Sequence, residues 1–134
     1  MSIIKVEEDN GPGTYVKKSG VEGFGLFASK DFSPGDVVVD YNLFPASWYK
    51  MKYADLTQEQ IARNAYVMID SEHCLTNDKR SKFSFINHSR EPNCDWIIRD
   101  RVIVAAQPIF QDEELFIDYR MEPRPNRVSF PAWI

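Results

Sequence analysis

Short β-strand segments separated by turns dominate this chain of 134 residues. β-Branched and aromatic residues fill only brief runs between Gly, Pro, Asn and Asp, a pattern that is typical of short strands. Because these runs rarely alternate with helical segments, a doubly wound parallel sheet is disfavoured. The sequence therefore predicts a mostly β domain with strands near residues 15–18, 25–28, 37–41, 66–69, 73–75, 96–98, 102–105 and 115–117.

One segment has the composition of a helix. Residues 57–64 contain good helix formers, and either Asp55 or Thr57 is a suitable N-cap. Two turns are also expected. Pro34-Gly35 predicts a tight turn within residues 32–36, and residues 99–101 predict a hairpin connection between two strands.

The bulk composition restricts the class of protein. The length fits one domain, no apolar run is long enough to span a membrane, and the first residues do not resemble a signal peptide. Cys74 and Cys94 allow at most one disulfide and cannot form a four-cysteine zinc site, so we expect a reducing, cytoplasmic location. The net charge of −4 argues against direct nucleic-acid binding and suits a basic partner, although it is also what keeps many small proteins soluble.

The glycine-bearing segment Gly20-Val21-Glu22-Gly23-Phe24-Gly25 has two interpretations. Its glycine spacing differs from the dinucleotide fingerprint, and a strand follows it rather than a helix, so a Rossmann site is disfavoured. Glycine also lets the backbone approach a ligand closely. The segment is therefore either a plain turn or a ligand-binding loop.

Two further segments carry polar side chains beside apolar strands. Residues 85–94 read Phe-Ile-Asn-His-Ser-Arg-Glu-Pro-Asn-Cys, and residues 112–119 read Asp-Glu-Glu-Leu-Phe-Ile-Asp-Tyr. Alone, Asn87-His88-Ser89 could be a capping turn, and His88 could be a general base. Tyr119 at a strand end is usually a packing residue. With two histidines and two cysteines in the chain, a metal site is not expected.

Taken together and in this order, the three segments resemble the SET-domain family of protein lysine methyltransferases. The resemblance extends over roughly residues 14–119, with residues 1–13 as a lead-in and residues 120–134 as a tail. It implies several small curved β-sheets with one or two short helices, arranged around a knot-like crossing where the second and third segments meet. The family transfers a methyl group from S-adenosylmethionine to a lysine side chain.

The resemblance also implies roles for individual residues. S-adenosylmethionine would be bound by Gly23, Phe24, Gly25, Asn87, His88 and Tyr119. Tyr119 would be the catalytic residue, and the target lysine would enter a narrow channel from the opposite side. Aromatic residues are available to line that channel, and we expect Tyr66, Phe85, Phe130 and Trp133 to do so. The substrate would be a lysine-containing protein, such as a histone or another basic protein. A monomer or homodimer is expected.

The sequence departs from the family pattern at one informative place. Many members carry a zinc-binding cysteine where Arg90 stands, with more cysteines after the final tyrosine, but no cysteine follows Tyr119. We therefore expect no zinc and a stand-alone domain of the bacterial or viral type. The tail either closes the lysine channel, with Phe130 or Trp133 folded back over the site, or packs elsewhere or forms a dimer contact. A secreted effector of that type would act in a host nucleus. Two alternatives remain open: a SET fold that binds a peptide or cofactor without turnover, and an interaction domain with chance similarity.

Overall fold

The computed structural model describes residues 6–21, 23–62, 66–77 and 79–123. Within these residues the chain is mostly β, as predicted, and its strands form four small sheets. The helical elements are α1 (Gln58–Ala62) and short 3₁₀ turns, including one at Lys82–Phe85 and one at Tyr119–Met121. The strands are β1 (Thr14–Lys18), β2 (Phe24–Ala28), β3 (Val37–Asp40), β4 (Trp48–Lys52), β5 (Tyr66–Met68), β6 (His73–Asn77), β7 (Asn87–His88), β8 (Cys94–Ile97), β9 (Val102–Ala105) and β10 (Phe116–Ile117).

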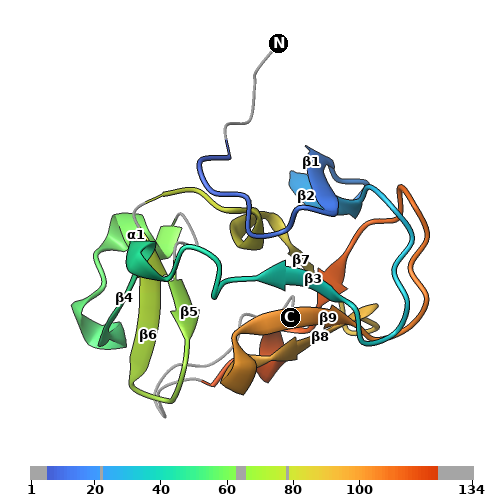
Figure 1. Cartoon of the computed structure of the whole chain (residues 1–134). Coiled ribbons are helices and arrows are strands. Elements are labelled where there is room, and N and C mark those ends of the chain that lie inside the picture. The colour runs from blue at the N-terminus through green and yellow to red at the C-terminus, as the bar shows by residue number, and fades with distance from the viewer. Residues whose placement is uncertain (1–5, 22, 63–65, 78, 124–134) are drawn as a thin grey trace.

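The four sheets lie side by side and do not form a single large layer (Figure 1). Strands β1 and β2 form an antiparallel hairpin, and two three-stranded antiparallel sheets have the orders β3-β9-β8 and β4-β6-β5. The fourth sheet is the parallel pair β7 and β10. In Figure 1 the β4-β6-β5 sheet lies at one end of the molecule beside α1, and β7 lies near its middle.

The expected helix and turns form for identifiable local reasons. Thr57 caps α1, because its hydroxyl accepts from Gln60 N at 3.1 Å while the Gln60 side chain accepts from Thr57 N at 2.8 Å. This reciprocal pair is a capping box. At the predicted turn, Asp36 N donates to Ser33 O at 3.0 Å and Gly35 has a φ of 90°, which favours glycine. The predicted hairpin joins β8 and β9.

Strand β4 was not expected from the sequence. Its residues alternate poorly, and Lys50 and Lys52 have low strand propensity. The strand forms because β6 offers a partner in register, from Trp48 opposite Asn77 to Lys52 opposite His73. Pairing with a distant strand thus overrides a weak local preference.

Two hydrophobic clusters hold the sheets together. The larger one joins β2, β3, β8, β9 and the segment before β10, and its fully buried members include Leu26, Val39, Ile103 and Leu115. The smaller one, formed by Leu56, Tyr66, Met68 and Cys74, lies under the β4-β6-β5 sheet. Cys74 and Cys94 are both buried and are not bonded to each other.

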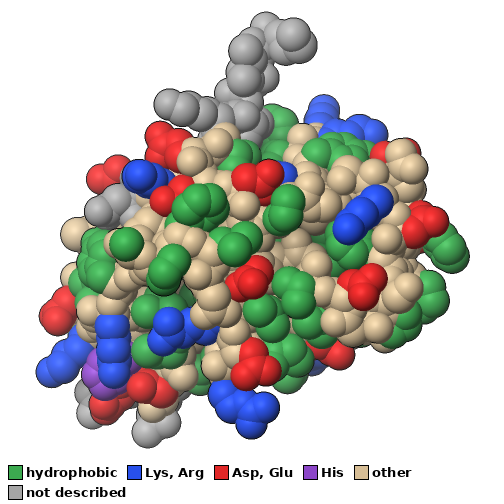
Figure 2. All heavy atoms as spheres, viewed as in Figure 1, with side chains coloured by type: hydrophobic (Ala, Val, Ile, Leu, Met, Phe, Trp, Pro, Cys, Tyr) green, Lys and Arg blue, Asp and Glu red, His purple; other side chains and the backbone are tan. Residues whose placement is uncertain are grey.

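The surface carries charges of both signs. On the face shown in Figure 2, acidic and basic side chains are interspersed with hydrophobic ones. None of the helices in the described ranges has the length and apolar character needed to cross a membrane.

Candidate active site

The parallel pairing of β7 with β10 brings the two polar segments together. Phe116 pairs with Asn87 and Ile117 with His88, and Ser89 N extends the ladder by donating to Ile117 O at 3.0 Å. Parallel strands cannot be joined by a tight turn, so a long crossover must connect them. The antiparallel strands β8 and β9 lie in this crossover. The predicted meeting of the two segments is therefore present.

Asn93 secures this pairing with its side chain. Its Nδ2 donates to Glu114 O at 2.8 Å, and its Oδ1 accepts from Phe116 N at 2.9 Å. The side chain thereby bonds the two backbone groups on either side of Leu115, as a neighbouring β-strand would. Because the residue is buried, both bonds are shielded from water.

Replacing Asn93 should therefore destabilise the fold. We expect Asn93→Ala to lower the free energy of unfolding by about 2–3 kcal/mol, because two backbone groups lose their partners. Urea denaturation followed by tryptophan fluorescence measures this change. Asn42→Ala is the matched control, because Asn42 also donates to a backbone carbonyl, Asp100 O at 2.8 Å, but is exposed. Equal losses in the two variants would contradict this role for Asn93.

Both the side chain and the backbone of Tyr119 hold it in place just after β10. Its hydroxyl donates to Ile86 O at 2.5 Å, its backbone N donates to His88 Nδ1 at 3.0 Å, and its ring lies 5.2 Å from the His88 ring. The 3₁₀ turn Tyr119–Met121 begins here, and Asp118 caps it by accepting from Arg120 N at 2.9 Å. Since the hydroxyl proton points at Ile86, the oxygen can act only as an acceptor toward another group.

His88 is a neutral imidazole in this arrangement. Its Nδ1 accepts a hydrogen bond from a backbone N–H, so the ring proton must lie on Nε2. Burial lowers the pKa of His88 below its ordinary value of 6.5, with Arg120 and Arg90 acting in the same direction and Asp118 opposing them. A ring that already carries its proton on Nε2 and uses Nδ1 for the backbone is a poor general base. His88 therefore positions Tyr119.

The lowered pKa of His88 predicts a pH-dependent stability. Between that pKa and 6.5 the unfolded state binds more protons than the native state, so stability falls as the pH falls through this window and is constant above it for this group. We expect the difference in unfolding free energy between the wild type and His88→Gln to shrink from pH 7 to pH 5. Chemical denaturation at several pH values measures it. His73→Gln is the control, since His73 lies on β6 away from the site; a pH-independent difference for His88→Gln would contradict the prediction.

Asp118 and Arg120 form an ion pair next to this group. Arg120 donates from Nε to Asp118 Oδ1 at 2.9 Å and from a terminal nitrogen to Oδ2 at 2.6 Å. This contact is the main reason why the pKa of Asp118 lies below its ordinary value. Asp118 therefore stays ionised near neutral pH, where it fixes the turn that carries Tyr119.

The Glu114 carboxylate links the glycine-bearing loop to β7 by hydrogen bonds. Glu114 accepts from Ser19 Oγ at 2.8 Å and from Asn87 Nδ2 at 3.0 Å, and Asn87 Nδ2 also donates to Phe24 O at 3.1 Å. Gly25 makes room for this arrangement, because a β-carbon on it would lie 2.4 Å from a Glu114 carboxylate oxygen. Gly25 thus accommodates Glu114.

The tip of the same loop is open. Gly23 has a φ of 51°, a conformation that favours glycine, and no atom lies within 4 Å of where its β-carbon would be. The neighbouring Phe24 side chain is 41% exposed. An exposed aromatic ring beside backbone groups and the half-buried Asn87 and His88 suits a ligand that contains both a flat ring and polar groups.

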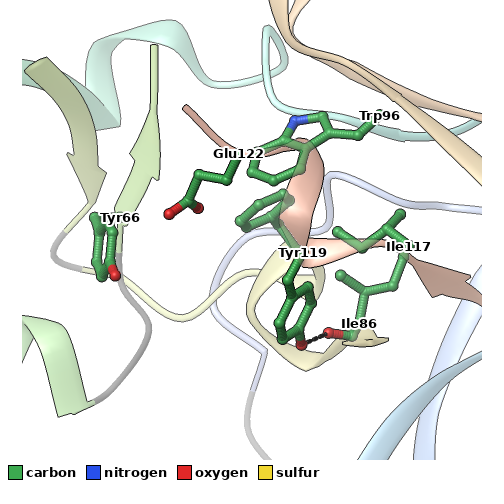
Figure 3. A pocket seen from close by; sticks show the side chains of 7 residues that line it. Tyr66, Ile86, Trp96, Ile117, Tyr119 and Glu122 are labelled. Carbon is green, nitrogen blue, oxygen red and sulfur yellow. Dashed lines mark hydrogen bonds between the residues drawn. The ribbon is translucent and has the colours of Figure 1, made fainter. Parts of the chain in front are cut away.

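A small pocket adjoins Tyr119 from the other side. Its volume is about 50 Å³, so it can hold the end of one side chain but not a nucleotide-sized ligand. Figure 3 shows Tyr66 at one side of this pocket and Tyr119, with its hydrogen bond to Ile86, at the other. The described lining consists of Tyr66, Phe83, Ile86, Trp96, Ile117, Tyr119 and Glu122.

Comparison with known proteins identifies the family. The SET domain profile matches residues 23–120, which is most of the chain. The chain belongs to the SET-domain family. This SET domain is 30% identical over 117 residues to "Histone-lysine N-methyltransferase, H3 lysine-4 specific" of Aspergillus oryzae, a match that covers 78% of this chain and 9% of that protein.

Other relatives lead to the same family. "Histone H3-lysine(4) N-trimethyltransferase ATX1" of Arabidopsis thaliana is 30% identical over 126 residues, covering 84% of this chain and 12% of that protein. The SET domain thus spans about a tenth of the length of these curated relatives. A crystal structure of a Plasmodium falciparum protein assigned as a histone methyltransferase matches with a TM-score of 0.58 at 15% identity, covering 91% of this chain and 97% of that one, and therefore shares the fold.

The structure gathers the predicted cofactor residues on one side of the SET domain. The loop that carries Gly23 and Phe24 lies against Asn87 through the bonds described above, and His88 connects this side to Tyr119. Gly25 lies in β2, directly after the loop, and faces Glu114. Ser19 and Glu114 were not proposed as site residues, although Glu114 belongs to one of the motifs that carried the resemblance.

Of the predicted channel residues that the structure describes, one lines the pocket and one does not. Tyr66 lines the pocket, whereas Phe85 is buried under the Arg80 guanidinium, which lies 4.4 Å from its ring centre. Phe130 and Trp133 lie outside the described residues. Phe83, Trp96 and Glu122 also line the pocket but were not expected there from the sequence. Two features of the sequence could have indicated them. Cys94 and Trp96 alternate inward on β8, and Glu122 follows Tyr119 by three residues.

Proposed function

We propose that this SET domain transfers a methyl group from S-adenosylmethionine to a lysine side chain of a protein. The observation that carries the proposal is the position of Tyr119. Tyr119 lines a narrow, largely aromatic pocket, and its backbone is bonded to His88 next to the glycine-bearing loop. The proposed cofactor surface and the proposed lysine pocket therefore lie on two sides of Tyr119.

The loop and β7 would hold the cofactor. Gly23 and Phe24 offer an open backbone surface and an exposed ring, and β7 lies beside them with the half-buried Asn87 and with His88, whose ring is buried. S-adenosylmethionine, when bound, supplies an electrophilic methyl group on a sulfonium sulfur. The carboxylate of Glu114 keeps the loop and the Asn87 amide in place. Gly25 serves the cofactor indirectly, by leaving room for that carboxylate.

The pocket would prepare the lysine nitrogen as a nucleophile. A free lysine has a pKa near 10.4, so neutral amine at pH 7 costs about 4.6 kcal/mol. Apolar walls such as Phe83, Trp96 and Ile117 lower that pKa by excluding water. The Tyr119 oxygen, which can only accept, takes an N–H of the amine and so directs the nitrogen lone pair toward the cofactor side. Alignment of this kind contributes to the rate without a strong base.

A basic protein is the substrate class that we propose. The chain carries a net charge of −4, which favours encounter with a lysine-rich partner. The relatives named above are histone H3 methyltransferases, so histone H3 is the first substrate to test.

Labelled methyl transfer tests the proposal directly. The purified chain is incubated with S-adenosylmethionine carrying a labelled methyl group and with histone H3, the other core histones and a panel of basic proteins. We expect label on lysine side chains, located by mass spectrometry of the peptides. Calorimetry run in parallel measures cofactor binding. Cofactor binding without transfer to any protein would favour a non-catalytic module, and absence of both would overturn the proposal.

A further inference from the structure

Glu122 gives the pocket beside Tyr119 an acidic side chain. Among the described lining residues it is the one with a formal charge, while the others are aromatic or aliphatic. Its side chain is half-buried. Figure 3 shows its carboxylate directed into the space between Tyr66 on one side and Tyr119 with Trp96 on the other.

The backbone fixes Glu122 relative to Tyr119. Glu122 N donates to Tyr119 O at 3.1 Å, closing the 3₁₀ turn that begins at Tyr119. In a 3₁₀ turn, residues three apart lie on the same face. The carboxylate and the tyrosine ring therefore face the same pocket because of local geometry, and the Asp118 cap stabilises that turn.

The charge of Glu122 acts on the interior of the protein. Burial raises the pKa of Tyr41 to about 12, and the Glu122 carboxylate adds to this effect. Burial likewise raises the pKa of Cys74 to about 11, again with a contribution from Glu122. Tyr41 and Cys74 belong to the two different core clusters, so the carboxylate lies where its field reaches both.

We propose that Glu122 makes this pocket selective for a cationic amine side chain, which it binds as an ammonium ion. The inference rests on the proposed function, because it names the residue by which that site distinguishes lysine from a neutral side chain of similar shape. A carboxylate favours the protonated amine and so opposes its deprotonation. Glu122 is therefore a specificity residue that acts on substrate binding, and it lies apart from the Tyr119 hydroxyl that acts on the amine (Figure 3).

The test uses n-butylammonium chloride as a probe for the lysine side chain and n-butanol as its neutral counterpart. Each is titrated into the ¹⁵N-labelled chain at constant ionic strength, and the shifts of the Trp96 and Tyr119 amide signals report pocket binding. We expect the wild type to bind n-butylammonium roughly tenfold more tightly than n-butanol, as two charges a few ångströms apart at a partly buried site should. Glu122→Gln should lose that preference while binding n-butanol as before.

Glu113→Gln is the matched control. It removes the same charge from an exposed carboxylate that accepts from Phe110 N, and glutamine can keep that bond. This variant should retain the preference for n-butylammonium. Equal binding of the two probes by the wild type, or an unchanged preference in Glu122→Gln, would overturn the inference. Equal binding of the two probes by the wild type overturns the inference even if Glu122→Gln does not fold.

The same variants separate this inference from the proposed function. In the methyl transfer assay, Glu122→Gln should raise the KM for the lysine substrate roughly tenfold without lowering kcat, because the carboxylate aids binding of the ammonium ion but opposes its deprotonation. A chain that prefers n-butylammonium through Glu122 but transfers no methyl group would retain the inference and overturn the proposed function. Active methyl transfer with an unchanged KM in Glu122→Gln would support the proposed function and overturn the inference about Glu122.

Discussion

Tyr119→Phe should bind S-adenosylmethionine as tightly as the wild type and lose most of its methyl transfer activity. The substitution keeps the ring that packs against His88 and the backbone bond to His88 Nδ1, so the cofactor side of the site is preserved. It removes the oxygen that we expect to orient the amine. Loss of one preorganised polar contact at a reacting group commonly costs a factor of about 10²–10³ in kcat. Calorimetry and single-turnover kinetics measure the two quantities.

Tyr15→Phe is the control for removing a tyrosine hydroxyl. Tyr15 lies on β1 and donates to Asp112 Oδ1 at 2.8 Å, away from the pocket, so its removal should leave kcat unchanged. Tyr119→Phe also leaves Ile86 O without its donor, which should lower stability by about 1 kcal/mol. A thermal melt checks that the variant is folded at the assay temperature. Full activity in a folded Tyr119→Phe protein would reject Tyr119 as the catalytic residue.

Gly25→Ala should abolish cofactor binding or weaken it severely. The added methyl group would lie 2.4 Å from a Glu114 carboxylate oxygen and 3.2 Å from Asn87 Nδ2, so the carboxylate must move. Its movement weakens or breaks the hydrogen bonds by which the Glu114 carboxylate holds Ser19 and Asn87. Overpacking of a tight site typically costs about 1–3 kcal/mol of stability. Calorimetry with S-adenosylmethionine and a denaturation curve measure both effects.

Gly20→Ala is the matched control for the glycine substitution. Gly20 lies in the loop before β2, its backbone φ is not in the left-handed range, and nothing lies within 4 Å of its β-carbon position. We expect normal cofactor affinity and stability from this variant. If Gly25→Ala binds the cofactor as well as Gly20→Ala does, the fastening of the loop by Glu114 is not required for binding.

Local sequence was sufficient to predict many of the elements. The runs around Val16, Leu26 and Ile103 are strands, Thr57 caps α1, and Gly35 lies in a turn. Each depends on residues within a few positions along the chain, such as a cap or a glycine that allows positive φ. Strand β4 was missed because it owes its conformation to β6, which lies more than twenty residues away.

From the sequence, only those residues of the candidate site that belong to a recognisable motif could be predicted. Asn87, His88 and Tyr119 belong to such motifs, and the structure brings them together. Phe83, Trp96 and Glu122 come from three separate elements and form no sequence pattern with Tyr119. Gly25 illustrates a different limit. A glycine suggests close approach of something to the backbone, but the sequence does not say that the approaching group is the protein's own Glu114.

The sequence by itself determined the mostly β class, the turns and the family of this protein, because these depend on local backbone preferences and on motif residues in a fixed order. The tertiary structure alone decided how those motifs work. The parallel pairing of β7 with β10 fixes the tautomer of His88, directs the Tyr119 hydroxyl proton to Ile86 and places Glu122 beside a narrow pocket. Such contacts join residues distant in the chain, and their geometry exists only once the sheets have packed.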